Sequence, residues 1–255
     1  MSRDKSAGAP PAPQNIYDDT TFFEGYRKLR QADSGLNGAL ELPALRGLLP
    51  ALDGLDILDL GCGFGDFARF ARARGAARVT AVDISRSMLD EAARLTDDPA
   101  ITYRREAIED YVADGQAFDL VVSSLALHYV ADYPAVLDRA FAALKPSGQF
   151  VFSVEHPMCT ANPVGWLRGE DGKARHWPVD HYREEGRRET RWFVDGVIKF
   201  HRTVETYVNG LIASGFRLDH LGEPAPTAEA LAARPALQLE CRRPPFLLLA
   251  ATRPG

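Results

Sequence analysis

The chain has 255 residues, a formal net charge of −5 at pH 7, 45% hydrophobic residues and 25% charged residues. This composition is typical of one large globular domain, or of a domain that carries an insertion. The acidic balance argues against a nucleic-acid partner, and no apolar run reaches the roughly 20 residues that span a bilayer, so no membrane partner is expected.

Neither the beginning of the chain nor its cysteines indicate export or a metal site. Residues 1–13 lack the apolar core of a secretory signal. The three cysteines, Cys62, Cys159 and Cys241, are too few and too scattered for a disulfide framework or a zinc site. We therefore expect a cytoplasmic protein without a bound metal.

The first 50 residues predict a tail followed by short helices. Residues 1–14 are rich in Ala, Pro and Gly and are predicted to be disordered. Asp19 and Thr20 offer N-caps for a helix with apolar residues at helical spacing from Phe22 to Leu29, and a second short helix is expected over 41–49. We treat residues 15–50 as a helical N-terminal segment.

From residue 51 to residue 255 the pattern alternates between strands and helices, which predicts an α/β fold. Strands are expected at 56–60, 79–82, 101–104, 118–123, 149–154, 216–221 and 246–251. Helices are expected at 65–74, 85–95, 134–144 and 204–214, with a weakly helical stretch at 108–112. Such alternation predicts a mostly parallel sheet with helices on both faces. The last two strands, joined by a polar loop, predict an antiparallel edge.

Residues 157–201 interrupt the alternation and are predicted to form an inserted cap. The runs 191–194 and 197–200 flank Asp195-Gly196, a strong signal for a two-residue hairpin turn. The aromatic residues of the cap could shape an apolar substrate pocket or form the hairpin's own core, the second being preferred for Trp166 and Trp192. Three histidines lie here, but no helical His-x-x-x-His spacing supports a metal.

The most informative motif runs from Asp59 to Gly65, at the end of the first predicted strand. It reads acid-x-Gly-x-Gly-x-Gly, and a second acid, Asp83, closes the next strand. Glycines at alternate positions let the backbone turn sharply and approach a ligand closely. A carboxylate at the end of the neighbouring strand can bind both hydroxyls of a ribose. Together these features predict a nucleoside-binding crevice.

The spacing of the motif distinguishes between nucleoside ligands. Dinucleotide loops read Gly-x-Gly-x-x-Gly and place a pyrophosphate at the helix N-terminus. Here the third glycine, Gly65, comes one residue early, and Asp66 stands where that phosphate would bind. A cationic ligand is therefore favoured. At this point the chain resembles the class I S-adenosylmethionine-dependent methyltransferases, whose first motif is similar to residues 59–65.

The resemblance implies a Rossmann-like, seven-stranded sheet and a site for S-adenosyl-L-methionine. It assigns the ribose to Asp83 and the ammonium group to Asp59, and it makes the N-terminal segment a lid over the cofactor. Tyr17 and Tyr26 could reach the methionine carboxylate with help from Arg30, or could pack as part of the apolar stripe. The expected cofactor-binding residues are Tyr17, Tyr26, Asp59, Gly61, Cys62, Gly63, Asp83, Ile84, Met88, Glu106, Ala107, Ile108, Ser123 and Leu127.

Three residues are candidates for catalysis. His128 follows the fourth strand, in a segment that resembles small-molecule methyltransferases and lacks the motifs of enzymes acting on nucleic-acid bases or glutamine. A histidine can accept a proton near neutral pH. Glu155 and His156 follow the fifth strand and could orient a substrate amine or hydroxyl. Each of the three could instead pack, cap or be solvated.

These observations predict a methyltransferase that moves a methyl group to an O, N or C atom of a small, partly apolar metabolite. A nicotinamide-dependent oxidoreductase and a non-catalytic S-adenosylmethionine-binding module remain as alternatives. The expected partner is a small-molecule substrate, and the protein is expected to be a monomer or a homodimer.

Overall fold

The computed structural model describes residues 12–32, 35–162 and 164–255. Most of the predicted tail, residues 1–11, lies outside the described residues. Residues 12–14 have no regular secondary structure. Among the described residues, no helix combines the length and the apolar character needed to cross a membrane.

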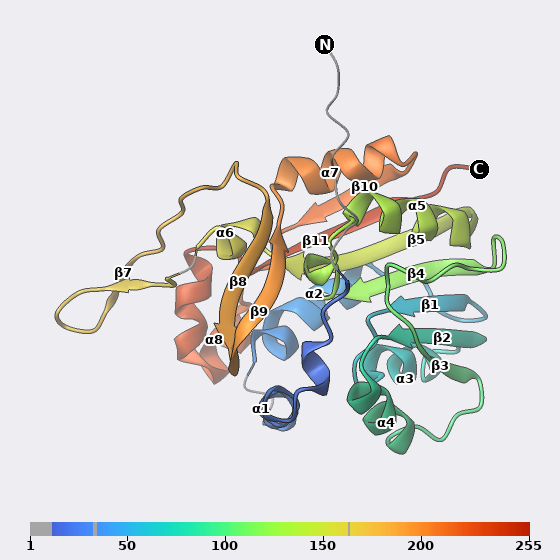
Figure 1. The fold of residues 1–255 in the computed structure, drawn as a ribbon, viewed down its shortest axis with the longest axis horizontal. Helices are drawn as coiled ribbons and strands as arrows, with labels where there is room; N and C mark the ends of the chain where they lie inside the picture. Colours follow the sequence, from blue (N-terminus) through green and yellow to red (C-terminus); the bar gives the residue numbers. More distant parts are fainter. Residues whose placement is uncertain (1–11, 33–34, 163) are drawn as a thin grey trace, which may run out of the picture.

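A seven-stranded sheet forms the centre of the molecule (Figure 1). Its strand order is β10-β11-β5-β4-β1-β2-β3. Strands β3, β2, β1, β4 and β5 are parallel, and β11 runs antiparallel between β5 and β10. The bounds are β1 Asp56–Leu60, β2 Arg78–Asp83, β3 Ile101–Arg105, β4 Phe118–Ser124, β5 Leu144–Glu155, β10 Arg217–Gly222 and β11 Phe246–Thr252. The predicted mostly parallel sheet with an antiparallel pair at its edge is confirmed.

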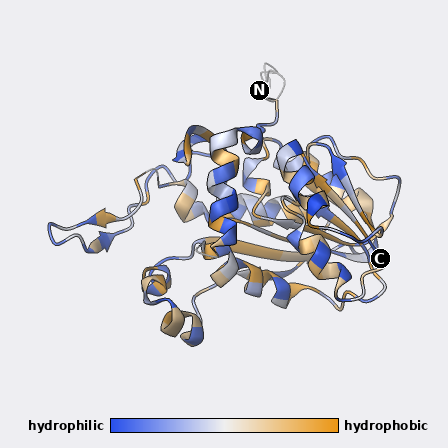
Figure 2. Ribbon diagram, turned by 90° about the horizontal axis from the view of Figure 1, so that it is seen from below, coloured by the Kyte–Doolittle hydropathy of each residue, from blue (hydrophilic) through white to orange (hydrophobic). Residues whose placement is uncertain are grey.

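Helices cover both faces of this sheet, as predicted. Leu45, Ala68 and Leu89 pack on one face, and Leu137 and Leu211 pack on the other. The helices with these residues are α2 Leu42–Leu48, α3 Asp66–Arg72, α4 Arg86–Arg94, α5 Tyr133–Ala143 and α7 Val204–Ala213. Figure 2 shows the apolar strands enclosed between helices that are apolar on one side and polar on the other. Strands buried on both faces explain the continuous apolar runs in the sequence.

The N-terminal segment contains a short 3₁₀ helix, η1 Ile16–Asp18, and the helix α1 Thr20–Gln31. The predicted N-cap is present, because the Asp19 carboxylate accepts a hydrogen bond from the backbone N–H of Phe22 at 2.9 Å. A π-helical turn, η2 Asn37–Glu41, leads directly into α2.

Two predictions about helices were wrong. Residues 108–112 form only a turn, because Gly115 soon ends the segment and Tyr111 is drawn into the sheet core. The polar loop expected before β11 contains the helix α8 Ala228–Ala233 and the 3₁₀ helix η4 Pro235–Cys241. Thr227 starts α8 as its N-cap.

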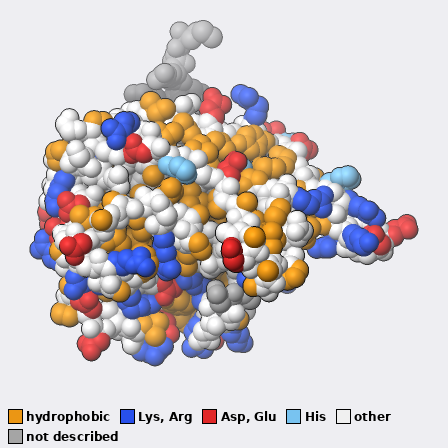
Figure 3. All heavy atoms as spheres, turned by 180° about the vertical axis from the view of Figure 1, so that it is seen from behind, with side chains coloured by type: hydrophobic (Ala, Val, Ile, Leu, Met, Phe, Trp, Pro, Cys, Tyr) orange, Lys and Arg blue, Asp and Glu red, His pale blue; other side chains and the backbone are white. Residues whose placement is uncertain are grey.

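The segment between β5 and α7 lies beside the carboxyl ends of the parallel strands (Figure 1). Its elements are the short helix α6 Pro157–Thr160 and the strands β6 Leu167–Arg168, β7 Ala174–His176, β8 Gly186–Trp192 and β9 Val194–His201. Strands β8 and β9 form the expected hairpin. The β6–β7 arm projects from the body and carries charged side chains (Figure 3).

The position predicted for the hairpin turn was wrong. Trp192 pairs with Val194, so Phe193 occupies the tip with a φ of 59°, while Asp195 and Gly196 form an irregularity within β9. Packing on α1 explains this shift. The Phe193 ring lies 5.5 Å from that of Phe22 and fills the space where a side chain at Gly25 would project. This tertiary contact outweighs the local turn preference.

Candidate active site

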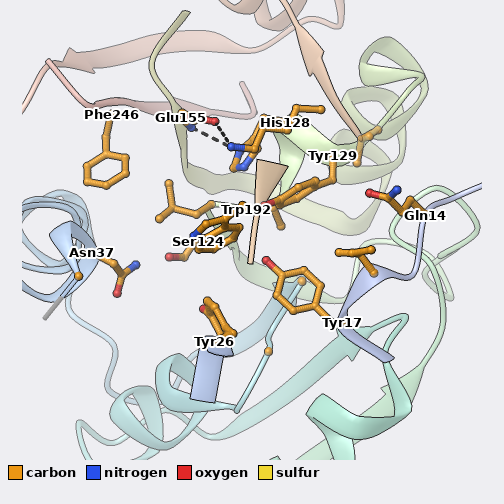
Figure 4. Close-up of a pocket in the computed structure, with 18 of the residues that line it drawn as sticks. Gln14, Tyr17, Tyr26, Asn37, Ser124, His128, Tyr129, Glu155, Trp192 and Phe246 are labelled. Carbon is orange, nitrogen blue, oxygen red and sulfur yellow. Dashed lines mark hydrogen bonds and ion pairs between the residues drawn. The ribbon is translucent and has the colours of Figure 1, made fainter. Parts of the chain in front are cut away.

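A cavity of about 800 Å³ opens at the carboxyl edge of the sheet (Figure 4). The strand order reverses between β1 and β4, which makes this edge the usual place for a ligand in an open α/β sheet. The loops after β1, β2, β4 and β5 line the floor of the cavity. The N-terminal segment and the β8–β9 hairpin line its other walls.

The loop after β1 requires its glycines for different reasons. Gly61, Gly63 and Gly65 have φ values of 79°, 53° and 72°, in the region that favours glycine. A Cβ at Gly61 would lie 2.4 Å from that of Ala126, and one at Gly65 would lie 2.1 Å from the hydroxyl of Tyr103. A Cβ at Gly63 would meet no atom within 4 Å outside its chain neighbours, so this face of the backbone borders open space in the cavity.

Asp83 anchors this loop to the end of β2. Its carboxylate accepts hydrogen bonds from the backbone N–H of Gly63 at 2.8 Å and of Ser85 at 2.9 Å. Burial raises the pKa of Asp83, and these two bonds oppose the shift. The carboxylate borders the cavity, so its remaining lone pairs are positioned for a ligand's hydroxyl groups.

Asp59 is a buried acid that lacks a compensating partner. Its side chain is 1% exposed, and Oδ2 has no hydrogen-bond partner among the residues that the structure describes. Burial, followed by the nearby charges of Asp83 and Asp66, raises the pKa of Asp59 to about 8. A positive charge in the cavity would favour the ionised form of this acid. The site therefore fits a cationic ligand.

Asp66, at the start of α3, also carries negative charge toward the cavity. It forms ion pairs of 2.5 Å with Arg30 from α1 and Arg69 from α3. A carboxylate therefore occupies the position where a dinucleotide phosphate would have to bind. This agrees with the prediction that the motif favours a cationic ligand over a pyrophosphate.

The N-terminal segment closes the cavity through two sets of hydrogen bonds. Gln14 donates to the carbonyl of Gly196 at 3.0 Å and accepts from the N–H of Ile198 at 2.9 Å. Asp18 accepts from the Ser85 hydroxyl at 2.7 Å, just after the ribose-binding candidate Asp83. Burial alone would raise the pKa of Asp18. The hydrogen bonds that its carboxylate accepts outweigh this effect, so the pKa lies well below its ordinary value. Neither contact was expected from the sequence.

A buried carboxyl joins the N-terminal segment to the sheet. Glu41 accepts hydrogen bonds from the hydroxyls of Ser153 at 2.5 Å and Ser124 at 2.9 Å, and from the Asn37 amide at 2.8 Å. Burial raises the pKa of Glu41. Asn37 and Ser124 also line the cavity. Neither was expected from the sequence.

Most of the residues expected to bind the cofactor do line the cavity. These are Tyr17, Tyr26, Asp59, Gly61, Cys62, Gly63, Asp83, Ile84, Met88, Ala107 and Ile108. Three lie outside its lining: Glu106 pairs with Arg104 at 3.0 Å, the buried Ser123 hydroxyl donates to the carbonyl of Leu60, and Leu127 packs in the core. The sequence placed them near the strand ends correctly, but it could not show which way each side chain points.

Of the three catalytic candidates, two line the cavity and one does not. His128 and Glu155 line the cavity. His156 does not: it is buried, accepts from the N–H of Met158 as the cap of α6, and contacts Glu223 at 2.9 Å. The turn that positions Glu155 at the cavity therefore directs the next side chain to a structural contact.

His128 is held as a neutral imidazole. Its Nδ1 accepts the backbone N–H of Glu155 at 3.3 Å, shown by a dashed line in Figure 4. Burial, followed by the positive charges of Lys199 and Arg202, lowers the pKa of His128 well below its ordinary value. A neutral ring whose Nδ1 accepts a hydrogen bond carries its proton on Nε2.

The hairpin contributes residues that the sequence did not single out. Lys199 forms a 2.6 Å ion pair with Glu155, and both side chains are largely buried. Trp192, expected in the hairpin's own core, instead lines the cavity and packs edge-to-face on Phe22 and Tyr26. Figure 4 shows Trp192, Tyr129 and Tyr17 around the centre of the cavity. Among the described residues, no cluster of His, Cys, Asp and Glu could hold a metal ion.

Comparisons with known proteins agree with this geometry. A family model described as a methyltransferase domain matches residues 57–148. The crystal structure of an S-adenosylmethionine-dependent methyltransferase from Mesorhizobium loti is 47% identical, with a TM-score of 0.81 over 86% of this chain and 100% of that one. An uncharacterized protein of Haemophilus influenzae is 34% identical over 94% of this chain and 97% of its own length.

Other relatives match a smaller share of the chain. A ubiquinone biosynthesis O-methyltransferase of Methylobacterium is 37% identical over 101 residues, which are 39% of this chain and 40% of that enzyme. The similarity therefore extends over most of the chain for some relatives and over less than half of it for others. The chain belongs to the class I S-adenosylmethionine-dependent methyltransferases, and it is an enzyme whose cofactor is S-adenosyl-L-methionine.

Proposed function

We propose that this enzyme transfers the methyl group to an O, N or C atom of a small, partly apolar metabolite. The observation that carries the proposal is the cavity itself. Its lining combines the glycine loop and Asp83, which would form the cofactor end, with His128, Tyr129, Glu155 and Lys199, which would form the acceptor end, so cofactor and acceptor would share one space. A volume of about 800 Å³ is in the range of small-molecule sites.

At the cofactor end, the proposed roles follow from charge and position. Asp83 would bind the ribose hydroxyls. Asp59 would face the ammonium group, and this positive charge would offset the cost of burying the Asp59 carboxylate. Ile84, Met88 and Ile108 would flank the adenine. Arg30, which pairs with Asp66 and also donates to the amide oxygen of Asn37, would assist in binding the methionine carboxylate together with Tyr17 and Tyr26. We also infer that residues 15–50 act as a lid and that 157–201 act as a cap.

At the acceptor end, two side chains have complementary tasks. The bound cofactor supplies an electrophilic methyl group, and the protein has to align an acceptor lone pair with it. His128 would donate a hydrogen bond from Nε2 and thereby orient the acceptor. Glu155, held by Lys199, would take up the proton that a hydroxyl or amine loses. This division of tasks replaces the expectation that His128 accepts the proton.

The named relatives support oxygen as the first acceptor atom to test. Matches include O-methyltransferases of ubiquinone biosynthesis and of malonyl-[acyl-carrier protein]. These matches cover 43% and 39% of this chain, so the acceptor itself has to be found by experiment. We further propose that the protein is cytoplasmic, has no nucleic-acid partner, and is a monomer or a homodimer.

The proposal can be tested with a metabolite extract and S-adenosyl-L-methionine labelled in the methyl group. We expect mass spectrometry to detect a labelled small molecule that depends on the enzyme. If S-adenosylhomocysteine binds but no small molecule acquires label, the proposal of a metabolite acceptor is wrong. A parallel titration with NAD is expected to show no binding.

A further inference from the structure

We propose that the methyl acceptor carries an anionic group, a carboxylate or a phosphate separate from the methylated atom, and that Arg243 binds this group. The inference rests on the proposed function and adds a substrate class to it. It comes from the charges around the cavity and from the state of the Arg243 side chain.

The charges that line the described cavity change sign along the chain. Before residue 125 the lining contains four carboxyl groups and one cation: Asp59, Asp66, Asp83, Glu109 and Arg30. After residue 125 it contains four cations and two carboxyl groups: Arg188, Arg191, Lys199, Arg243, Glu155 and Glu189. The first group suits a cationic cofactor. The second group gives the acceptor side a positive excess, which suits an anion.

Among the four cations, Lys199 and Arg243 are largely buried in the wall of the cavity, and Lys199 is already paired with Glu155 at 2.6 Å. The Arg243 side chain is 8% exposed, and its guanidinium lies over the ring of Trp177 with 4.0 Å between the guanidinium carbon and the ring centre. A rigid, buried guanidinium loses little freedom when it binds a ligand. Arg188 and Arg191, by contrast, lie on the more exposed strand β8.

The hydrogen-bonding capacity of Arg243 is poorly used. Its Nη2 lies 3.1 Å from Oε2 of Glu240, but neither that oxygen nor Nε of Arg243 has a hydrogen-bond partner in the described part of the chain. Its Nη1 donates to the thiol of Cys159 at 3.1 Å, and sulfur is a weak acceptor. Cys159 also lines the cavity. An oxyanion in the cavity next to Cys159 would supply Nη1 with a stronger acceptor than the thiol.

The position of Arg243 also fits an acceptor of metabolite size. Arg243 precedes β11, which is three strands from β1 in the order β1, β4, β5, β11. At about 4.8 Å per strand, this places it roughly 14 Å across the sheet edge from the glycine loop. The cofactor's reactive end and the acceptor can occupy this span, with the anion at the far end and the nucleophile near His128.

The test uses the protein saturated with S-adenosylhomocysteine, titrated calorimetrically with benzoate, with inorganic phosphate and with benzamide. Benzamide is the uncharged counterpart of benzoate. We expect at least one of the two anions to bind, and benzamide to bind at least about tenfold more weakly than benzoate if benzoate is the anion that binds. Equal binding of benzoate and benzamide, or binding of neither anion, would overturn the proposal.

Matched variants locate the site. Arg243→Gln should weaken anion binding at least about tenfold, the loss expected for charge-assisted hydrogen bonds. Arg242→Gln makes the same charge change on the adjacent exposed residue and should leave anion binding unchanged. Arg243→Lys keeps the charge without the planar fork, and it should bind the anion with intermediate affinity. Anion binding by Arg243→Gln that equals the wild type would refute the assignment.

The titration with S-adenosylhomocysteine separates this inference from the proposed function. If the wild-type protein does not bind S-adenosylhomocysteine, the proposed function itself fails. If all variants bind S-adenosylhomocysteine with wild-type affinity and the Arg243 substitutions do not change anion binding, only the further inference fails. Should Arg243→Gln not fold, Arg243→Lys and the benzamide comparison still decide the question.

Discussion

At the scale of single residues, Asp83 is the side chain whose role in binding the cofactor can be tested most directly. Its carboxylate holds Gly63 and Ser85 and borders the cavity. Asp83→Ala should lower the affinity for S-adenosylhomocysteine by about 1.5–3 kcal/mol for each ribose hydrogen bond that is lost. Isothermal titration measures this change. Unchanged affinity would show that the ribose binds elsewhere.

The two acceptor-side candidates should differ in the size of their effects. If His128 only donates an orienting hydrogen bond, His128→Ala should lower turnover by about tenfold or less. If Glu155 accepts the proton, Glu155→Gln should cost about 10²- to 10⁴-fold. Both variants should bind S-adenosylhomocysteine like the wild type. A larger loss for His128→Ala than for Glu155→Gln would reverse the assignment; the readout is turnover of the labelled methyl donor.

At the scale of elements, the contact between Gln14 and the hairpin ties the N-terminal segment over the cavity. Gln14→Ala removes both hydrogen bonds to β9. We expect S-adenosylhomocysteine to dissociate several-fold faster, because the segment opens more often. Stopped-flow displacement measures the rate. Gln149→Ala, on β5 away from the cavity, is the matched control, and equal rates for the two variants would contradict a closing role.

Glu41 has a structural task between elements. Its carboxyl satisfies the hydroxyls of Ser124 and Ser153 and the amide of Asn37. Glu41→Ala leaves the buried Ser153 hydroxyl without this acceptor, at about 1–3 kcal/mol, and also removes the acceptor of the half-buried Ser124 and Asn37. The free energy of unfolding, measured with urea, should fall accordingly. A decrease of less than about 1 kcal/mol would mean that water or another side chain replaces the carboxyl.

The sequence predicts an element well when the conformation of that element depends on its own residues and not on contacts with distant parts of the chain. The loop from Asp59 to Gly65 needs glycines wherever it occurs, so its position and its ligand class could be predicted. The turn at Phe193 could not, because a contact with α1 decides it. Arg243 was missed for a similar reason: it lies in a segment without periodicity, and only the fold brings it to the cavity.

At the scale of the whole molecule, the sheet brings together charges from distant parts of the chain. Asp59, Asp66 and Asp83 come from the first third of the sequence, and Lys199 and Arg243 come from the last third. Both sets of charges line the same cavity at the carboxyl edge of the seven-stranded sheet. Like charges buried this close oppose folding unless a ligand compensates them. Folding stability and cofactor binding are therefore linked through Asp59.

This linkage gives a prediction with a definite sign. The pKa of Asp59 is about 8 in the folded protein, against an ordinary value of 3.8 for an aspartate side chain. The folded protein therefore binds more protons than the unfolded chain between these values, and the contribution of Asp59 to stability is present below about pH 4 and is lost as the pH rises toward 8. The loss amounts to at most about 1.4 kcal/mol per pH unit.

Urea unfolding between about pH 5 and pH 8 measures this contribution. The free energy of unfolding of the wild type should fall with pH more steeply than that of Asp59→Asn, in which position 59 no longer titrates. Saturation with S-adenosylhomocysteine should flatten the wild-type slope, because the ligand's ammonium lowers the pKa of Asp59. Glu41 is unchanged in both proteins, so its raised pKa contributes equally to the two slopes. Parallel slopes for wild type and variant would mean that Asp59 is not the group through which the cofactor's charge stabilises the fold.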